Sequence, residues 1–214
     1  MNSTNVNNGI KNNQSHELNH ITADKNPFIQ FTKWYEYILN SDLNEPTAMT
    51  LSTADVNGNP SARIVLLKEF DDTGFVFYTN YESRKGKDLK ENPKAALNFF
   101  WDQQRRQIRI EGRIEKISQE TSKKYFSSRP RESQIGAWVS AQSSEVPNRE
   151  FLENKFEELV EKFGNEEIPL PDYWGGYRVI PNYFEFWQGR ENRLHDRICY
   201  KKQKDDWKII RLAP

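Results

Sequence analysis

The triplet Ser83-Arg84-Lys85 places two cations beside a hydroxyl group, at a point where a short helix is predicted to begin. Ser83 is a favoured N-cap residue, so Arg84 and Lys85 fall in the first helical turn. Cations are mildly unfavourable at this positive end of the helix dipole, whereas a bound anion would meet free N–H groups and both side chains. The triplet therefore indicates a phosphate site, with a solvated basic turn as the alternative.

A second pair of cations, Arg63 and Lys68, bounds the apolar segment 63–68, which has the composition of a β-strand. Successive side chains of a strand point to opposite faces, so the two cations are expected on opposite faces. Such a strand can touch two ligands, one on each face. The alternative is that both side chains extend from the strand ends into water.

A third cluster, Tyr125, Arg129 and Ser133, gathers basic and hydroxyl groups near the end of a predicted helix, next to the helix breaker Pro130. Groups of this kind suit a phosphate monoester. A charged exposed loop is the alternative interpretation.

A fourth cluster lies in segment 187–197, where a Trp and a Gly precede several cationic or titratable side chains. In a strand, Arg193, His195 and Arg197 would share one face. Three potential cations on one face repel one another unless an anion or an electron-rich ring offsets them. The alternative is a local ion network with Glu191 and Asp196.

Composition narrows the class of ligand. The 214 residues include 31 Lys and Arg and 31 Asp and Glu, so the formal net charge is zero and no global basic field for nucleic acid or a membrane surface is expected. Common phosphate-loop, metal-hydrolase and serine-hydrolase motifs do not occur, and neither a metal site nor a membrane span is expected. The single cysteine, Cys199, fits a reducing compartment such as the cytoplasm. Separate anion sites with Trp and Tyr side chains favour a small ligand that has a phosphate and a flat ring.

The elements that must position these clusters follow from hydrophobic periodicity and turn residues. Helices are predicted over 26–40, 83–92, 119–128 and 148–164. Strand hairpins are predicted over 47–70 and 94–118, with a further strand over 75–80 and a return to strands over 175–214, about six or seven strands in all.

Consecutive strands joined by short turns must be antiparallel. The predicted fold class is therefore mainly β with peripheral helices (α+β), in the form of an antiparallel barrel or strongly bent sheet. Residues 1–25 are rich in Asn and Ser and are expected to form a flexible tail ahead of a single domain over 26–214.

In their order along the chain, these motifs resemble those of the pyridoxine/pyridoxamine 5′-phosphate oxidase family. The matching motifs are Arg63-Ile-Val-Leu-Leu-Lys68, Phe77-Tyr-Thr-Asn80, Ser83-Arg-Lys85, the segment from Tyr125 to Trp138, Gln142-Ser-Ser144, Trp174-Gly-Gly176, Phe186-Trp-Gln-Gly189 and Arg193-Leu-His-Asp-Arg197. The similarity extends from about residue 27 to the terminal Arg211-Leu-Ala-Pro214. Any one motif is weakly specific, whereas their ordered combination is highly specific.

The resemblance implies an antiparallel split β-barrel that binds FMN, and a cytoplasmic homodimer with FMN at the subunit interface. It implies oxidation of pyridoxine 5′-phosphate and pyridoxamine 5′-phosphate to pyridoxal 5′-phosphate, the last step of vitamin B6 cofactor synthesis and salvage. O2 is the implied electron acceptor and H2O2 the by-product, with ammonia also released from the amine.

The resemblance also implies roles for individual residues. FMN is expected to contact Arg63, Ile64, Val65, Leu66, Leu67, Lys68, Tyr78, Thr79, Arg84, Lys85, Gln107, Gln142, Ser143, Trp187 and Arg197, some of them from the second subunit. The substrate phosphate is expected at Lys68, Tyr125, Arg129 and Ser133, and the substrate ring at Arg193 and His195. Arg193, His195 and Arg197 are expected to act in catalysis, Arg197 by stabilising the reduced flavin anion. No protein general base is assigned.

The chain departs from the family in one respect. A basic, tyrosine-containing segment that folds over the active site in many members has no counterpart in residues 1–25, so lid closure or substrate affinity could differ. Two rival functions stay open: another flavin split-barrel protein with a nicotinamide reductant, and a non-catalytic carrier of FMN or pyridoxal phosphate. The Tyr125 to Ser133 cluster and Arg193-Leu-His195 argue against the first rival, and turnover in air would distinguish the second.

Overall fold

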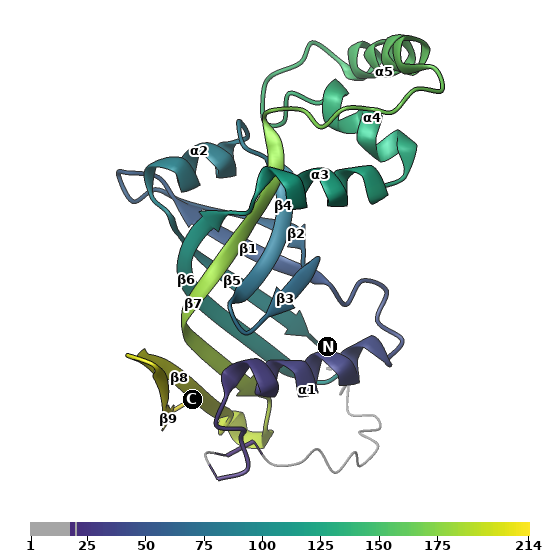
Figure 1. Cartoon of the computed structure of the whole chain (residues 1–214). Helices are drawn as coiled ribbons and strands as arrows, with labels where there is room; N and C mark the ends of the chain where they lie inside the picture. The colour runs from purple at the N-terminus through teal and green to yellow at the C-terminus, as the bar shows by residue number, and fades with distance from the viewer. Residues whose placement is uncertain (1–17, 20) are drawn as a thin grey trace, which may run out of the picture.

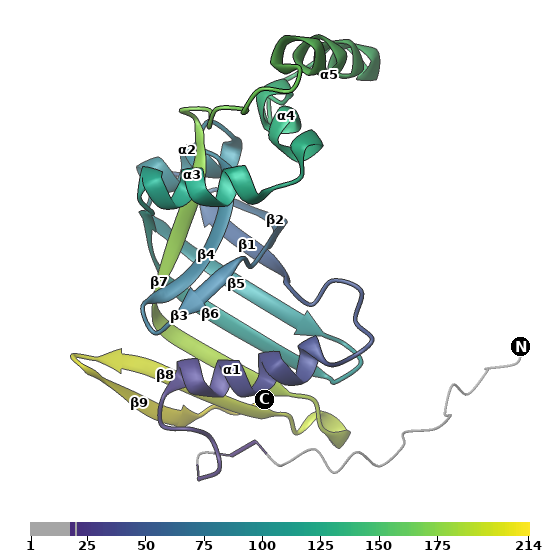
Figure 2. The same cartoon turned by 45° about the vertical axis from the view of Figure 1, so that its right-hand side comes forward.

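The computed structural model describes residues 18–19 and 21–214 of the chain (Figure 1). In this part of the chain, nine strands form one antiparallel sheet that curls into a half-barrel, with helix α1 at one end and helices α2 to α5 toward the other (Figure 2). The predicted mainly β fold class with peripheral helices is confirmed.

Short connections join most consecutive strands, but α2 lies between β4 and β5, and α3 to α5 lie between β6 and β7. Their bounds are β1 Ala48–Ala54, β2 Pro60–Leu66, β3 Glu69–Asp71, β4 Gly74–Asn80, β5 Lys94–Trp101, β6 Arg106–Lys116, β7 Trp174–Gln188, β8 Asp196–Gln203 and β9 Asp206–Arg211. The order in the sheet is β2-β1-β5-β6-β7-β4-β3, and β8 and β9 continue from β7 in another direction.

Strand β7 joins the two directions of the sheet. Its first residues, Trp174–Val179, pair with β4, and its last residues, 183–188, pair with β8, while β6 runs along its other edge. A β-bulge separates these halves, where Gly112 of β6 faces Pro181. A Cβ at Gly112 would lie 2.1 Å from the carbonyl oxygen of Ile180, so this close approach of two strands requires glycine. The bulge bends β7 and lets one strand serve both the barrel and the C-terminal hairpin.

Five α-helices are described: α1 Pro27–Leu39, α2 Arg84–Glu91, α3 Gln119–Ser128, α4 Arg131–Val139 and α5 Arg149–Phe163. Helix α1 begins as predicted, because the Asn26 side-chain oxygen accepts the Phe28 N–H at 2.9 Å and Pro27 occupies the first helical position. Its apolar face closes one end of the curled sheet, where Phe31 packs edge-on against Phe75 and Phe99. All three side chains are fully buried.

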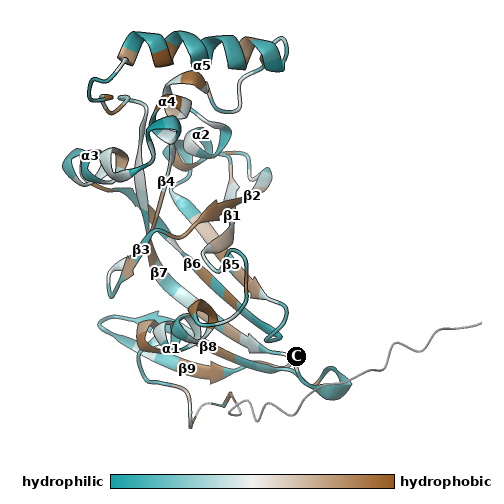
Figure 3. Ribbon diagram, turned by 90° about the vertical axis from the view of Figure 1, so that its right-hand side faces the viewer, coloured by the Kyte–Doolittle hydropathy of each residue, from teal (hydrophilic) through white to brown (hydrophobic). Residues whose placement is uncertain are grey.

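A second, smaller core lies beneath α3, α4 and α5. It is formed by Phe126, Ile135, Val139, Leu159, Ile168 and Trp174. Helix α5 is mostly hydrophilic along its length and lies at the end of the molecule opposite α1 (Figure 3). Only Leu159 of α5 is buried among its residues, whereas Phe151 and Val160 of the predicted apolar face stay exposed.

Three predicted elements differ from the structure. The strand predicted over 60–70 ends at Leu66 and resumes as β3, which is one reason why nine strands are described where about six or seven were expected. Helix α4 was not predicted, because Pro130 was interpreted only as a helix breaker, although proline is also favoured at helix starts. The predicted return to strands over 175–214 is interrupted after β7, because Glu191–Arg193 forms a 3₁₀ turn and β8 begins only at Asp196.

The predicted flexible tail over residues 1–25 lies mostly outside the described residues, and His16 and His20 lie there too. The described part of that range packs against the body of the protein. Leu18 is 5% exposed, and the carbonyl oxygen of Asp24 accepts the Tyr200 hydroxyl at 2.7 Å. Contacts with the core therefore begin before the predicted boundary at residue 26.

Candidate functional site

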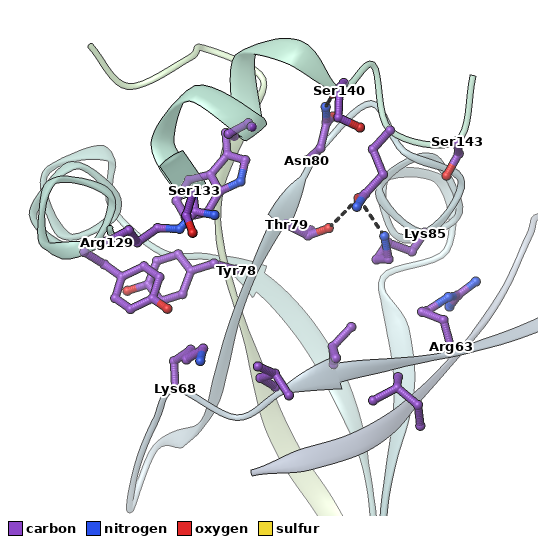
Figure 4. A pocket seen from close by; sticks show the side chains of 18 of the residues that line it. Arg63, Lys68, Tyr78, Thr79, Asn80, Lys85, Arg129, Ser133, Ser140 and Ser143 are labelled. Carbon is purple, nitrogen blue, oxygen red and sulfur yellow. Dashed lines mark hydrogen bonds between the residues drawn. The ribbon is translucent and has the colours of Figure 1, made fainter. Parts of the chain in front are cut away.

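A cleft of about 970 Å³ opens between β2, β4, the start of α2 and the α3–α4 region. Its lining residues are Ser61, Arg63, Ile64, Val65, Leu66, Lys68, Tyr78, Thr79, Asn80, Arg84, Lys85, Tyr125, Arg129, Pro130, Ser133, Gly136, Ala137, Ser140, Gln142, Ser143 and Trp174. Cationic side chains gather on two sides (Figure 4): Arg63 and Lys85 with Ser143 on one, Lys68 and Arg129 with Ser133 on the other. These are called the Arg63 side and the Arg129 side below.

Arg63 is held in place by its own sheet. Its guanidinium donates to the Thr53 hydroxyl at 2.8 Å and to the Leu51 carbonyl oxygen at 3.2 Å. Asp88 of α2 lies 3.9 Å from the guanidinium and accepts the Thr53 hydroxyl at 2.6 Å. Strand β1 and helix α2 thus fix the direction of a cation that β2 carries into the cleft.

Lys85 is the most deeply buried cation of the Arg63 side. Its side chain is 8% exposed, and Nζ donates to the Gln142 side-chain oxygen at 2.9 Å. Burial, followed by the nearby positive charge of Arg63, lowers the pKa of Lys85 from its usual value to about 8. An anion bound between these two cations would favour the protonated form again, which is the behaviour expected of an anion site.

The start of α2 confirms the predicted capping by Ser83. The fully buried Ser83 hydroxyl oxygen accepts the Gly86 N–H at 3.4 Å, and both Arg84 and Lys85 line the cleft. A Cβ at Gly86 would lie 2.0 Å from the Tyr81 carbonyl oxygen. Glycine is therefore needed for the helix start to reach this position.

The Arg129 side is built from stacked aromatic rings. The rings of Tyr78 and Tyr125 stack at 3.8 Å, and the Arg129 guanidinium lies 4.8 Å from the ring centre of Trp174. Burial lowers the pKa of Arg129 and raises the pKa of Tyr78 and of Tyr125. The Arg129 Nη1 and the Tyr78 hydroxyl are buried without a hydrogen-bond partner among the described residues. Both residues line the cleft, so a ligand bound there can supply an acceptor for these groups.

Arg63 and Lys68 were predicted on opposite faces of one strand, but the structure places them on the two sides of a single cleft. The reason is that β2 ends at Leu66, so Lys68 no longer follows the alternation of that strand. Leu67, also expected at the flavin, is 3% exposed in the core and does not line the cleft.

Five predicted site residues lie elsewhere, in what is called the C-terminal cluster below. Its members are Gln107, Trp187, Arg193, His195 and Arg197. Gln107, Trp187 and Arg197 face one another across β6, β7 and β8, and the His195 ring lies 4.7 Å from that of Trp187. Strand β7 starts in the cleft at Trp174, so Trp187 lies roughly 40 Å further along the same strand before curvature is counted.

The C-terminal cluster has a geometry that the sequence did not predict. Arg193 does not share a strand face with His195 and Arg197, because it ends the 3₁₀ turn with a left-handed φ of 60°. The His195 Nδ1 accepts the Arg190 backbone N–H at 3.0 Å, so the neutral imidazole carries its proton on Nε2. Arg197 pairs with Glu185, at 2.7 Å, rather than with Asp196.

Several lining residues were missed by the sequence reasoning: Ser61, Asn80, Pro130, Gly136, Ala137, Ser140 and Trp174. Most of them are small or polar residues, which carry no chemical signal in a single sequence, although Asn80, Pro130, Gly136, Ala137 and Trp174 lie within or at the ends of the quoted motifs. Glu185 was missed too, because an acidic residue in an aromatic strand was not considered as a partner for Arg197.

None of the described helices combines the length and apolar character that crossing a membrane requires. No cluster of three or more His, Cys, Asp or Glu side chains suited to a metal ion was found in the same part of the chain.

Comparison with known proteins identifies similar families and structures. Residues 39–163 match a family model described as pyridoxamine 5′-phosphate oxidase. Residues 174–214 match one described as the pyridoxine 5′-phosphate oxidase C-terminal dimerisation region.

Curated relatives match over nearly their whole length. A protein of Nostoc sp. named pyridoxine/pyridoxamine 5′-phosphate oxidase is 56% identical over 198 residues, which is 92% of each chain. A protein of the same name from Cupriavidus necator is 56% identical over 189 residues, covering 88% of this chain and 89% of the relative.

Two solved structures share the fold. PhzG from Burkholderia lata, in complex with tetrahydrophenazine-1-carboxylic acid, superposes with a TM-score of 0.86 at 30% identity, covering 91% of this chain and 95% of that one. An FMN-binding protein from Nostoc punctiforme, described as pyridoxamine 5′-phosphate oxidase-related, has a TM-score of 0.73 at 16% identity, covering 88% and 98%.

Proposed function

The chain belongs to the pyridoxamine 5′-phosphate oxidase family, and from this premise we propose its reaction and the roles of its residues. It is an FMN-dependent oxidase that converts pyridoxine 5′-phosphate and pyridoxamine 5′-phosphate to pyridoxal 5′-phosphate. O2 accepts the electrons, H2O2 is formed, and the amine substrate also releases ammonia. The observation that carries the proposal is a single cleft with two cationic sides, one for the phosphate of a cofactor and one for the phosphate of a substrate.

The Arg63 side fits the phosphate of FMN. Arg63, Arg84 and Lys85 supply positive charge beside the Ser83-capped start of α2, and Ser143 adds a hydroxyl. Phosphate oxygens prefer such charge-assisted donors. Between the two sides, Thr79 and the β2 residues Val65 and Leu66 offer a partly apolar surface for the flavin ring. FMN, when bound, supplies the two-electron redox chemistry that the side chains lack.

The Arg129 side holds the substrate phosphate in this proposal. Lys68, Tyr125, Arg129 and Ser133 supply two cations and two hydroxyl groups, and the unpartnered Nη1 of Arg129 provides a buried donor. Anchoring the phosphate there fixes the position of the substrate ring, which removes much of the entropic cost of bringing it to the redox centre.

The C-terminal cluster completes the site from the second subunit. The chain forms a homodimer, consistent with the dimerisation-region match over residues 174–214. We infer that Gln107, Trp187 and Arg197 of one protomer contact the FMN in the cleft of its partner, and that Arg193 and His195 cover the substrate ring. With Nδ1 occupied by the Arg190 N–H, the Nε2–H of His195 acts as a hydrogen-bond donor. The Arg197 guanidinium stabilises negative charge that develops on the cofactor.

The Burkholderia lata relative, solved in complex with tetrahydrophenazine-1-carboxylic acid, raises a second candidate substrate for this chain: a reduced ring compound that carries a carboxylate instead of a phosphate. The Arg129 side favours the phosphorylated substrate, because it assembles two cations and two hydroxyl groups around one position. The cytoplasmic location expected from the sequence stays a prediction.

A visible spectrum tests the proposed reaction. The protein is loaded with FMN, oxygen is removed, pyridoxine 5′-phosphate is added and the blue flavin band is followed. The expected result is that the band bleaches when the substrate is added and recovers when air is admitted. A bound flavin that bleaches with neither the alcohol nor the amine substrate would contradict the oxidase, leaving a carrier or a nicotinamide-dependent flavoprotein. Repeating the experiment with tetrahydrophenazine-1-carboxylic acid in place of pyridoxine 5′-phosphate distinguishes the two candidate substrates.

A further inference from the structure

We propose that Glu185 and the C-terminal residues 213–214 are positioning elements that orient the Arg197 guanidinium toward bound FMN. The inference rests on the proposed function, because it takes Arg197 as a flavin contact. Neither Glu185 nor the chain end lines the cleft or is expected to touch a ligand. Both act through Arg197.

Glu185 is a buried carboxylate surrounded by donors. Its side chain is 3% exposed, and one oxygen accepts the Arg197 Nε–H at 2.7 Å. The other lies 3.2 Å from Arg109 Nη2 and accepts the Tyr183 hydroxyl at 3.1 Å. These donors hold the pKa of Glu185 below its usual value despite burial, so the carboxylate is charged at neutral pH. Arg109 and Tyr183 thus hold the Glu185 carboxylate in place. The carboxylate in turn orients Arg197.

The chain end holds a second edge of the same guanidinium. Arg197 Nη1 donates to the Ala213 carbonyl oxygen at 2.7 Å, and the Leu212 N–H donates to the Arg197 carbonyl oxygen at 3.0 Å. The residues that follow β9 therefore lie beside β8 and contact Arg197 of that strand.

Arginine has five N–H donors in a planar fork. The bonds to Glu185 and Ala213 use the Nε and Nη1 positions, and no protein acceptor for Nη2 is found among the described residues. The Arg197 side chain is 26% exposed. The guanidinium is thus fixed on two edges, and its third edge stays available to a ligand. A side chain that is already fixed in its binding orientation loses less conformational entropy when the ligand binds.

A double-mutant cycle tests the proposal through the affinity for FMN, measured as quenching of FMN fluorescence on titration with the apoprotein. Glu185→Gln keeps the side-chain shape but removes the charge, and we expect the FMN Kd to rise about tenfold. Arg197→Met is expected to raise it at least as much. The double variant should bind FMN no more weakly than Arg197→Met alone, because Glu185 acts through Arg197.

Glu111→Gln is the matched control. Glu111 also pairs with Arg109, at 3.3 Å, but its side chain is 47% exposed and has no described contact with Arg197. The FMN Kd of this variant should stay unchanged.

Removing Ala213 and Pro214 tests the same idea without altering a buried charge. The truncated chain should also bind FMN more weakly, and its effect should vanish in the Arg197→Met background. If Glu185→Gln fails to fold, this truncation decides the question.

Additive losses in either cycle, or an unchanged Kd in both Glu185→Gln and the truncated chain, would overturn the positioning role. A different result identifies failure of the proposed function: an unchanged FMN Kd in Arg197→Met would show that Arg197 is not a flavin contact.

Discussion

Lys85 shows how burial tunes a single residue for anion binding. The fold removes its ammonium group from water and places it near Arg63, so the pKa falls to about 8. Burying the charged ammonium group costs solvation free energy, and a bound anion offsets this cost. The charged form of Lys85 is therefore favoured when an anionic ligand is bound.

We therefore predict that FMN affinity decreases above about pH 8. In the free protein Lys85 loses its proton as the pH rises through this value, whereas binding of a phosphate requires the ammonium form. Each complex then takes up one proton, and Kd rises by up to about tenfold per pH unit. Fluorescence titration between pH 7 and pH 9.5 measures this slope, in a window set by the lowered pKa.

Lys85→Arg is the control, because arginine stays protonated throughout that range. Its FMN affinity should be nearly independent of pH in the same window. An equal slope in both proteins would assign the pH dependence to another group.

Arg129 allows the two phosphate sites to be separated. Arg129→Ala should raise KM for pyridoxine 5′-phosphate by roughly tenfold to a hundredfold, the loss of a charged hydrogen bond, while the FMN Kd stays unchanged. Lys124→Ala, an exposed cation of the same helix that does not line the cleft, should change neither value. Weaker FMN binding with unaltered KM would mean that the two phosphate assignments are exchanged.

At the scale of elements, the cleft depends on where β2 stops and where α2 starts. The end of β2 at Leu66 brings Lys68 to the same cleft as Arg63. The start of α2 brings Arg84 and Lys85 there, and it reaches that position only because Gly86 has no side chain in the way of the Tyr81 carbonyl.

We predict that Gly86→Ala destabilises the protein and weakens FMN binding. A methyl group would overlap the Tyr81 carbonyl oxygen, and relieving such a clash costs about 1–3 kcal/mol or more. Thermal unfolding and FMN titration measure the two effects. Gly136→Ala in α4 is the matched control for unfolding, since nothing lies within 4 Å of its Cβ position, and its Tm should be unchanged or higher. An unaltered Tm in Gly86→Ala would show that α2 can move aside.

At the scale of the whole molecule, one chain does not bring its two groups of site residues together. The cleft surrounds the first residues of β7, whereas the C-terminal cluster lies beside its last residues. We propose that two-fold symmetry brings them together, because an isologous dimer can place the cluster of each protomer at the cleft of its partner.

This arrangement predicts complementation between two impaired variants. When Arg129→Ala and Arg197→Met chains are unfolded, mixed in equal amounts and refolded, half of the dimers are mixed. One site of each mixed dimer then has a wild-type cleft and a wild-type cluster, so about a quarter of wild-type activity should return. Refolding each variant alone provides the control. If the refolded mixture is no more active than the average of the two variants refolded alone, the cleft and the cluster of each site come from the same chain.

The sequence alone determined the local elements and the chemical types of the site. Asn26 with Pro27 and Ser83 marked helix starts that the structure confirms, because a helix cap depends on neighbouring residues. The ordered motifs likewise led to the family that the comparisons confirm.

Only the tertiary structure decided which residues meet. The end of β2, the helix after Pro130, the bulge at Gly112 and the pairing of Arg197 with Glu185 depend on contacts between residues far apart in the chain. The alternation of residues in a sequence predicts that a strand forms, but it does not show where contacts with a neighbouring strand end or bend it. For the same reason, spacing alone placed Arg63 and Lys68 on opposite faces of one strand, whereas in the folded chain both residues line one cleft.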